Sequence, residues 1–474
     1  MRTVAFATLG CKLNTYESHA LGEAFEARAY EIVPLGSPAD VVVINSCTVT
    51  ARSDYKSRQL VRRVLRTTPH ARVVVTGCYA EREAQAIVEI PGVYLVVGNR
   101  AKLAIPELLE GDAEGGTVLD VESEGSTFAR TPLTGFGDQS RAFLKIQDGC
   151  DYRCTFCIVK SVRGASRSLD EESVTTHARA LVDSGYAEIS LTGVDPGAWG
   201  RDIEGRPTMA RLVESLAKID GLERIRLSSV GPQDYDDHLI ELVGGHPKLA
   251  RHVHIPVQSG DDRILSRMKR GSRRARIDRL VDRLYAVDSS IRVGGDFLVG
   301  FPGEDEEAFD ATRRMLSEGP WSYGHVFPFS ARPGTEAAAM TDQVADRTRT
   351  ERAALLRFLL ARKDRTYAAT FVGRRIGVLI EGRGEPETRY APGLSSHYLR
   401  VAIRGGGARA GKIAMVDVTG ADGNRLIGRL AEPMETSDGT FPGNRDEAGQ
   451  HPDRGHALRS GIRDLVGALP GLRQ

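Results

Sequence analysis

Cysteine is scarce in this chain, with six in 474 residues. Aromatic residues make up 6% of the sequence, too few to predict a broad base-stacking surface for single-stranded nucleic acid. The net charge is +1, so any nucleic-acid binding must depend on local basic patches rather than on the chain as a whole. Long apolar runs are also lacking, since stretches such as VVVI at 41–44 are far shorter than a membrane span.

The N-terminus has no charged region followed by a sustained apolar stretch, so we expect no signal peptide and no membrane association. A cytoplasmic, reducing location is the resulting expectation. In that setting, clustered cysteines more often bind metal or carry out chemistry than form disulfides. With 41% apolar and 27% charged residues, the sequence is typical of a globular protein of about three domains.

Three apolar runs near the N-terminus each lead into a cysteine. VAFATLG precedes Cys11, VVVINS precedes Cys47 and RVVVTG precedes Cys78, and a helical pattern follows each cysteine. Alternating strands and helices predict a parallel sheet. Because ligands of such sheets lie beyond the carboxyl ends of the strands, we expect these cysteines, here called the sheet triplet, to converge there. A fourth run, VYLVVGN at 93–99, has no cysteine.

The remaining cysteines, Cys150, Cys154 and Cys157, lie within DGCDYRCTFC and are here called the loop triplet. A second series of strands and helices surrounds them. Its strands are expected at 143–147, 188–193, 224–229, 252–258, 293–301 and 323–330, which indicates an open (βα)6 barrel. Barrel sites lie at the carboxyl ends of the strands, where Gly193, Ser229, Gln258 and Gly300 fall.

The predicted fold class is α/β with a small β-barrel at the end, organised in six segments. These are an N-terminal parallel-sheet α/β domain (1–110), a linker with room for one short strand (111–140), the partial barrel (141–342), a connecting helix (343–370), a small antiparallel β-barrel (371–432) and a disordered tail (433–474).

Two triplets that account for every cysteine fit iron–sulfur clusters better than they fit other roles of cysteine. A structural zinc ion needs a fourth Cys or His nearby, whereas His70 and His177 lie away from the triplets. A 4Fe–4S cluster held by three thiolates leaves one iron with an open coordination position. Reactive metal sites keep such a position, and structural sites close it.

With both triplets identified, the sequence resembles the radical S-adenosylmethionine (SAM) methylthiotransferases from residue 1 to about 431. The motifs are TLGCKLNTYES, NSCTVT and VTGCYA, then CTFCIVKSVRG, LTGVDPGAWG, RLSSVGP, HIPVQSGDDRILSRMKRG, DFLVGFPGE and FSARPGT. The resemblance implies two 4Fe–4S clusters, held by the six cysteines, and chemistry borne by cofactors rather than by a catalytic side chain. SAM is the further cofactor, with Gly193, Ser229, Gln258 and Gly300 as candidate contacts. The terminal β-barrel resembles the RNA-binding TRAM domain.

Within this family, LGCKLN resembles the branch that acts on threonylcarbamoyl-adenosine next to the tRNA anticodon. The isopentenyl-adenosine branch reads closer to YGCQMN, and the branch that modifies a ribosomal-protein aspartate reads closer to LGCPKN, so Lys12 and Asn14 favour the first. The other two substrates stay open as alternatives, as does, more distantly, a non-catalytic iron–sulfur RNA-binding regulator. The sequence departs from the family pattern at Lys160–Ser161, in place of proline and an aromatic residue, and at Gly231, where an acid often follows the SS pair.

The resemblance implies tRNA as partner and an electron donor such as flavodoxin or ferredoxin, and we expect a monomer. Candidate tRNA contacts on the helical stretch 56–66 are Lys56, Arg58, Arg62 and Arg63, although a solvated helix face explains them equally well. The basic stretch 267–279 has the same two interpretations. In the terminal barrel, candidates for RNA contact or for core packing are Tyr390, His397, Tyr398 and Arg400.

Overall fold

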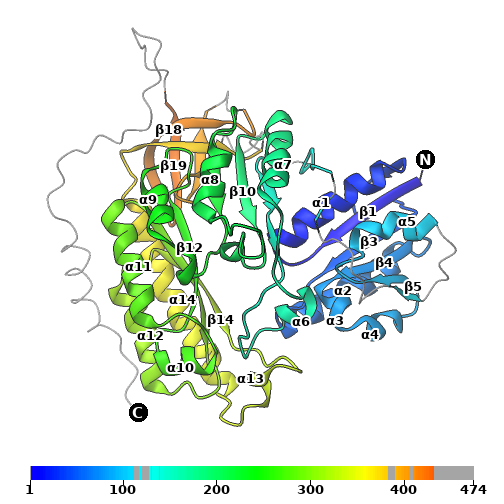
Figure 1. Ribbon diagram of the computed structural model, residues 1–474, viewed down its shortest axis with the longest axis horizontal. Helices are drawn as coiled ribbons and strands as arrows, with labels where there is room; N and C mark the ends of the chain where they lie inside the picture. The colour runs from blue at the N-terminus through cyan, green and yellow to red at the C-terminus, as the bar shows by residue number, and fades with distance from the viewer. Residues whose placement is uncertain are drawn as a thin grey trace, which may run out of the picture.

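The structure is a computed structural model that describes residues 2–110, 117–119, 128–129, 131–137, 139–382, 390–405 and 409–431 (Figure 1). The predicted disordered tail lies outside the described residues, as does much of the predicted linker. Figure 1 shows the N-terminal sheet and its helices in blue, the central strands and helices in cyan to yellow, and the C-terminal barrel in orange.

The N-terminal part is a six-stranded parallel sheet in the order β2-β1-β3-β4-β5-β6. Its strands are β1 (Arg2–Thr8), β2 (Tyr30–Ile32), β3 (Val41–Ser46), β4 (Arg72–Gly77), β5 (Val93–Val97) and β6 (Thr117–Leu119). Every residue of β3 is buried, as expected for a central strand covered on both faces. The predicted parallel sheet is confirmed. The edge strand β2 was not predicted, because two of its three residues are exposed and it has no apolar run.

Helices cover both faces of this sheet. They are α1 (Lys12–Glu26), α2 (Ala51–Thr67), α3 (Cys78–Arg82), α4 (Ala84–Val88) and α5 (Ile105–Glu110), with the 3-10 turn η1 (Lys102–Ala104). Alternate residues of β3 and β4 enter two separate apolar clusters, one on each face of the sheet. Helix α2 begins beyond Thr50, whose Oγ1 accepts a hydrogen bond from the Ser53 amide at 3.2 Å.

Six parallel strands form the central part in two groups, β11-β10-β7 and β12-β13-β14. They are β7 (Ala142–Lys145), β10 (Glu188–Thr192), β11 (Arg224–Leu227), β12 (His252–Gln258), β13 (Arg292–Val299) and β14 (Tyr323–Pro328). An isolated bridge joins Ile225 to Leu249 between the groups. All six predicted strands are present in their predicted places, and the open (βα)6 barrel is confirmed. A short pair, β8 (Gln147–Asp148) and β9 (Arg167–Ser168), follows β7.

The central part has its own helices, most of which pack on the outer face of its strands in one large apolar core, while a smaller apolar cluster lies around Phe301. They are α6 (Val159–Arg163), α7 (Glu171–Asp183), α8 (Met209–Ala217), α9 (Asp237–Gly245), α10 (Asp262–Arg267), α11 (Arg274–Val287), α12 (Glu306–Glu318) and α13 (Glu336–Ala339), with the 3-10 turns η2 (Pro196–Ala198) and η3 (Pro232–Asp234). An aspartate caps the amino end of α7, α9, α10 and α12, where its carboxylate accepts backbone hydrogen bonds and complements the helix dipole.

Helix α14 (Asp346–Ala369) leads to a closed five-stranded barrel in the order β15-β16-β17-β19-β18. Its strands are β15 (Arg375–Ile380), β16 (Tyr390–Ser395), β17 (Arg400–Arg404), β18 (Ile413–Asp422) and β19 (Arg425–Leu430). The predicted small barrel is confirmed, with one refinement: β17 and β19 pair in parallel, whereas the other pairs are antiparallel. Strand direction cannot alternate at every pair of a closed ring with an odd number of strands, so one parallel pair is unavoidable.

The C-terminal barrel lies against the amino-terminal ends of β10 and β11. Buried Arg224 donates to the carbonyl of Gly377 at 3.1 Å, and buried Arg226 donates to that of Ser395 at 3.1 Å. Glu188 pairs with both arginines and balances part of their charge. The opposite end of the central barrel is therefore left to the loop triplet. No helix within the described residues is long and apolar enough to cross a membrane.

Candidate functional site

The sheet triplet lies along one edge of the N-terminal sheet. Cys11 is the N-cap of α1 beyond β1, Cys47 directly follows β3, and Cys78 begins α3 after β4. Since β1, β3 and β4 are neighbours, their carboxyl ends bring the three thiols together. Gly10 approaches so closely that a Cβ there would stand 3.2 Å from the sulfur of Cys47. Cys11 is exposed and the other two are partly buried, so a ligand can reach this edge.

The loop triplet lies on the segment between β8 and α6, which backbone contacts hold in place. The Cys150 amide donates to the carbonyl of Gly164 at 3.0 Å, and the Cys157 amide donates to that of Cys154 at 3.1 Å. Gly149 has φ +75°, and a Cβ there would come within 1.9 Å of the Ala165 carbonyl oxygen. Only glycine fits this position, so the sequence DGC is needed to turn the chain into the loop.

Neither triplet is arranged for a single metal ion. Thiolates around one zinc ion lie about 3.8 Å apart, as follows from Zn–S bonds of about 2.3 Å. Among the described residues, which include all six cysteines, neither triplet has its three sulfur atoms within 4.8 Å of one another. A cluster whose corners are separate iron atoms suits this wider spacing.

Burial makes these thiols reluctant to ionise on their own. It raises the pKa of Cys150 to about 12 and that of Cys157 to about 11, and it also raises the pKa of Cys78. Thiolates there require nearby positive charge, which a metal cluster supplies when it binds. The chemistry of both donor sets therefore fits iron–sulfur clusters.

Arg163, six residues after Cys157, connects the two triplets. Its Nε donates to the sulfur of Cys78 at 3.2 Å, and its guanidinium also donates to Asn14 at 2.8 Å and pairs with Glu17. Asn14 and Glu17 lie on α1, whereas Arg163 ends α6. One buried arginine thus ties the loop of the central barrel to the cysteine edge of the N-terminal sheet.

The network around Arg163 carries an excess of positive charge. Glu17 pairs with Lys102, Lys145 and Arg163, and Asp148 lies 2.8 Å from Lys145. Burial alone would raise the pKa of Glu17, but these three cations hold it well below the usual value. Three cations face two carboxylates, and the sulfur of Cys78 lies beside the surplus charge. This charge favours an anionic sulfur and opposes the effect of burial, which still leaves the pKa of Cys78 raised.

The four candidate SAM contacts differ in their surroundings. Gly193 follows β10, and a Cβ there would come within 2.9 Å of the Gln147 backbone. Gln258 has φ +74° at the end of β12, a strained conformation that often marks a functional site. Ser229 is partly buried beyond β11. Gly300 is buried against Arg349, whose Cγ lies 2.1 Å from the place of a Cβ, so a tight turn explains this glycine.

Two carboxylates near the loop triplet were missed by the sequence analysis. The Asp195 amide donates a hydrogen bond to Gln147 Oε1 at 2.8 Å, and Gln147 Nε2 in turn donates to the carbonyl of Gly149. Asp234 hydrogen-bonds Gln233, which also contacts Tyr152 inside the cysteine loop. Asp195 stands within LTGVDPGAWG, a motif that carried the family resemblance, whereas Asp234 lies two residues after RLSSVGP. Nothing in the sequence showed that the two aspartates face the same loop.

Asp234 occupies the space beside Gly231. A Cβ on Gly231 would stand 2.7 Å from Asp234 Oδ2, and one on Gly197 would stand 2.5 Å from it. A carboxylate from three positions later therefore lies beside Gly231, the position at which the sequence lacks an acid. Gly197 and Gly231 have no side chain, which leaves space for the Asp234 carboxylate.

The predicted RNA contacts fall into two groups. Lys56, Arg62 and Arg63 are exposed on α2, whereas Arg58 is partly buried and donates to Tyr79 Oη at 2.9 Å. In the second basic stretch, Arg267 and Lys269 pair with acids, and Arg270 donates to the sulfur of Cys154 at 3.5 Å. That stretch therefore supports the cysteine loop and its surroundings.

His397 and Tyr398 in the C-terminal barrel face the central barrel. The Tyr398 ring lies 4.6 Å from that of His252, and His397 lies 4.6 Å from Phe371. Packing explains both residues, whereas Arg400 is exposed.

Comparison with known proteins gives matches to both major parts of the chain. Residues 144–316 match a family described as the radical SAM superfamily, and residues 3–98 match one described as uncharacterized protein family UPF0004. The chain is 37% identical over 426 residues to threonylcarbamoyladenosine tRNA methylthiotransferase MtaB of Bacillus subtilis (strain 168), which covers 88% of this chain and 94% of that protein.

A second relative has a different printed substrate. It is the tRNA-2-methylthio-N(6)-dimethylallyladenosine synthase of Jannaschia sp. (strain CCS1), 36% identical over 89% of this chain and 93% of that protein. Among solved structures, the radical S-adenosylmethionine methyltransferase TsrM from Kitasatospora setae, with tryptophan and a SAM analogue bound, aligns over 71% of this chain and 75% of that one. Its TM-score is 0.55 at 16% identity, a likeness of fold alone.

Proposed function

The chain belongs to the radical SAM methylthiotransferases, and from this premise we propose that it adds a methylthio group to threonylcarbamoyl-adenosine next to the anticodon of tRNA. Membership confirms the predicted family, the predicted enzyme class and the predicted cofactors, 4Fe–4S clusters and SAM. The choice of nucleoside and the residues that hold each cofactor form the proposal.

The proposal assigns one cluster to each triplet. Cys11, Cys47 and Cys78 would hold the first, and Cys150, Cys154 and Cys157 the second. When bound, the clusters and SAM supply the one-electron chemistry and the sulfur and methyl groups that the reaction needs. The protein's part is to hold the two sites at a fixed separation, and the Arg163 network does so from within the interface.

For SAM we propose contacts at the polar loops next to the loop triplet. Gly193 and Gln258 remain candidates at the strand ends. Asp195 and Asp234 are added, because their carboxylates can accept hydrogen bonds from hydroxyl or ammonium groups of the cofactor. Asp234 is the stronger addition, since it fills the space next to Gly231 where an acid is usual.

Lys12 is the observation that favours threonylcarbamoyl-adenosine over the isopentenyl nucleoside. The relatives that carry these two substrates in their names are 37% and 36% identical, so identity does not separate them. The Lys12 ammonium lies 5.8 Å from the Tyr398 ring, and Arg141 and Arg226 are charged groups near it. Within the described residues Lys12 has no ion-pair partner, whereas Arg226 pairs with Glu188.

A carboxylate on the substrate would satisfy this lysine. The threonylcarbamoyl group carries a carboxylate, whereas an isopentenyl group is an uncharged hydrocarbon. Charge complementarity beside Cys11 therefore favours the first nucleoside. Asn14, the other residue of the LGCKLN motif, is buried and binds Arg163, the carbonyl of Leu9 and that of Ser46, so its role is to hold the interface.

Exposed cations give tRNA two places to bind. Arg404 on β17 and Arg429 on β19 are directly opposite in register and both exposed. Like charges in that position repel, so an anionic partner such as a phosphate would stabilise them. Lys56, Arg62 and Arg63 on α2 offer the second patch.

The reaction would take place in the cytoplasm, with a flavodoxin or ferredoxin as electron donor and the enzyme as a monomer.

Mass spectrometry of digested tRNA from a deletion strain tests this proposal. The strain should lack the methylthio derivative of threonylcarbamoyl-adenosine and accumulate the unmethylthiolated nucleoside, and the wild-type gene should restore it. Loss of the methylthio isopentenyl nucleoside instead would transfer the assignment to the second nucleoside. An unchanged nucleoside profile would refute tRNA as the substrate and leave the ribosomal-protein alternative.

A further inference from the structure

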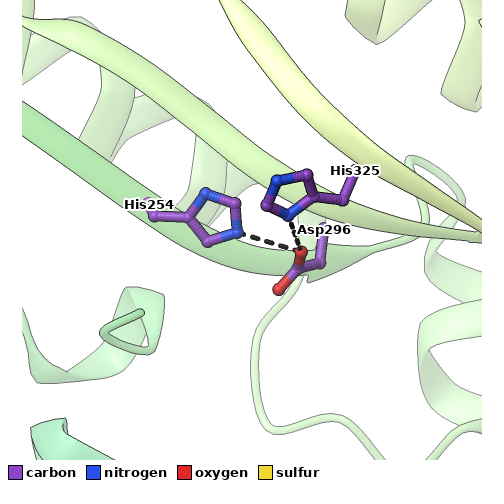
Figure 2. A group of neighbouring side chains, drawn as sticks. All are labelled: His254, Asp296 and His325. Atoms are coloured by element: carbon purple, nitrogen blue, oxygen red, sulfur yellow. Dashed lines mark hydrogen bonds and ion pairs between the residues drawn. The ribbon is translucent and has the colours of Figure 1, made fainter. Parts of the chain in front are cut away.

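Three side chains on neighbouring strands of the central barrel bring their metal-binding atoms together. They are His254 on β12, Asp296 on β13 and His325 on β14, and each donor atom lies within 4.8 Å of the other two. Figure 2 shows both imidazole rings turned toward the carboxylate. His254 Nε2 lies 2.9 Å from Asp296 Oδ1, and His325 Nδ1 lies 3.1 Å from the same oxygen.

The group lies on the inner face of the strands. The residues next to it in sequence, Val253, Phe297 and Val326, belong to the apolar core under the outer helices. Successive side chains of a strand alternate between faces, so the three polar side chains point the opposite way. Side-chain exposure rises from 8% for His254 to 23% for Asp296 and 61% for His325. One side of the group is held in the protein, and the other is open.

We propose that His254, Asp296 and His325 bind a divalent metal ion, with zinc as the first candidate. Two imidazoles and a carboxylate are ligands that zinc takes in proteins, at about 2.0–2.2 Å. Tetrahedral bonds of that length place donor atoms about 3.3 Å apart. The observed separations of 2.9 and 3.1 Å differ from this by a few tenths of an ångström. Small side-chain movements would therefore admit the ion.

The surroundings of His254 match those of a metal ligand. Its second ring nitrogen, Nδ1, lies 2.7 Å from Tyr323 Oη, and the same hydroxyl contacts His252 Nε2. A partner on the second nitrogen fixes the tautomer and the ring orientation of a ligating histidine. All three ligands also stand on strands of the rigid core, which hold them more precisely than loops would.

The charge of Asp296 is not balanced by the usual partners. Among the described residues it pairs with no lysine or arginine, and its ion-pair partners are the two imidazoles. A bound cation would balance the charge of this carboxylate.

A metal ion held by three protein ligands would keep coordination positions toward the open side. His325 faces that side, and Phe327 on the same strand is 42% exposed. An oxygen atom of a molecule inside the barrel could occupy such a position. None of the site's three ligands belongs to either cysteine triplet.

Zinc binding to the anaerobically reconstituted holoprotein tests the proposal. The protein, with its clusters loaded, is dialysed against Zn²⁺, and zinc, iron and sulfide are measured in the same sample. The wild type should take up about one zinc per chain with no loss of iron. His325→Ala, a change at an exposed side chain that the fold should tolerate, should weaken zinc binding at least about 100-fold. Asp296→Asn should act likewise.

A matched control is His238→Ala, because His238 is an exposed histidine that also contacts a carboxylate, Glu214, at 3.0 Å. It should bind zinc like the wild type. Three results would overturn the proposal: a wild type that takes up no zinc, equal uptake by His325→Ala and the wild type, and uptake matched by an equal loss of iron. Because metal is measured directly, a failure here is distinct from a failure of the tRNA assignment.

Discussion

The Nε of Arg163 donates a hydrogen bond to the sulfur of Cys78 at 3.2 Å, across the interface between the central barrel and the N-terminal sheet. The same guanidinium pairs with Glu17, and Asp148 lies 3.6 Å away. A side chain that follows one cysteine triplet therefore contacts a member of the other. The separation of the two sites is fixed by a buried charge network rather than by a flexible connection.

Arg163→Gln should destabilise the protein strongly. Glu17 and Asp148 would lose a buried cation, and removal of one partner from a buried ion pair costs about 3–5 kcal/mol. The midpoint of thermal unfolding of the holoprotein should fall by several degrees. Arg263→Gln is the control, because Arg263 forms ion pairs on the surface that contribute about 1 kcal/mol or less. Equal midpoints for the two variants would mean that the network does not hold the interface.

Cys78→Ala should abolish methylthiolation and leave SAM cleavage intact. Cys78 belongs to the sheet triplet, whereas the proposed SAM contacts surround the loop triplet in another part of the chain. Iron and sulfide content should fall by about half, and reduced protein should still convert SAM to 5′-deoxyadenosine. A folded variant unable to form that product would show that the two sites do not divide the reaction in this way.

Asp234→Asn should stabilise the protein and weaken SAM binding. Burial, with the nearby charge of Asp195, raises the pKa of Asp234 to about 6. A raised carboxyl pKa means that the folded state prefers the protonated acid, so this group costs stability as the pH rises from about 4 through 6. The cost is complete above pH 6 and amounts to at most about 3 kcal/mol. The variant should therefore unfold at a higher temperature than the wild type at pH 7.5 but not at pH 4.

The same variant should bind SAM about tenfold more weakly in calorimetry, the effect of one lost charge-assisted hydrogen bond. Asp237→Asn is the control, since Asp237 is 77% exposed and pairs with Arg283. Unchanged SAM affinity in Asp234→Asn would remove this residue from the proposed cofactor site.

Paired alanine substitutions should locate the tRNA. Arg404→Ala with Arg429→Ala should weaken tRNA binding and reduce the slope of log K against log salt by about 1–2, if each arginine neutralises a phosphate. Arg62→Ala with Arg63→Ala on α2 should do the same. The control is Arg425→Ala, a change in the same barrel at a residue already paired with Asp422. If a double variant shows the same salt dependence of tRNA binding as the control, its pair of arginines does not contact tRNA phosphates.

The strands and the cysteine positions could be predicted from the sequence because local patterns determine them. Runs such as VVVINS are buried on both faces, and β-branched residues favour such strands. Parallel order then brings Cys11, Cys47 and Cys78 to one edge without further information. The six barrel strands follow from the same alternation with helices.

Contacts between distant segments could not be predicted in this way. Arg163 and Glu17 are 146 positions apart, and nothing in either local sequence indicates the other. Asp234 stands outside the usual acid position, and only the folded chain shows its carboxylate beside Gly231. Tyr398 was a candidate for RNA contact because the sequence of its barrel resembles an RNA-binding domain, but packing of that barrel on β10 and β11 turns it inward.

The central claim is that each cluster is held by three cysteines and keeps one iron free for a small molecule. Mössbauer spectroscopy of ⁵⁷Fe-reconstituted protein, with and without SAM, tests it most directly. The account predicts two 4Fe–4S clusters per chain, with one iron site of the loop-triplet cluster changed when SAM is added. Zinc in place of iron would contradict the account. Spectra that do not change when SAM is added, because protein side chains coordinate every iron atom, would also contradict it.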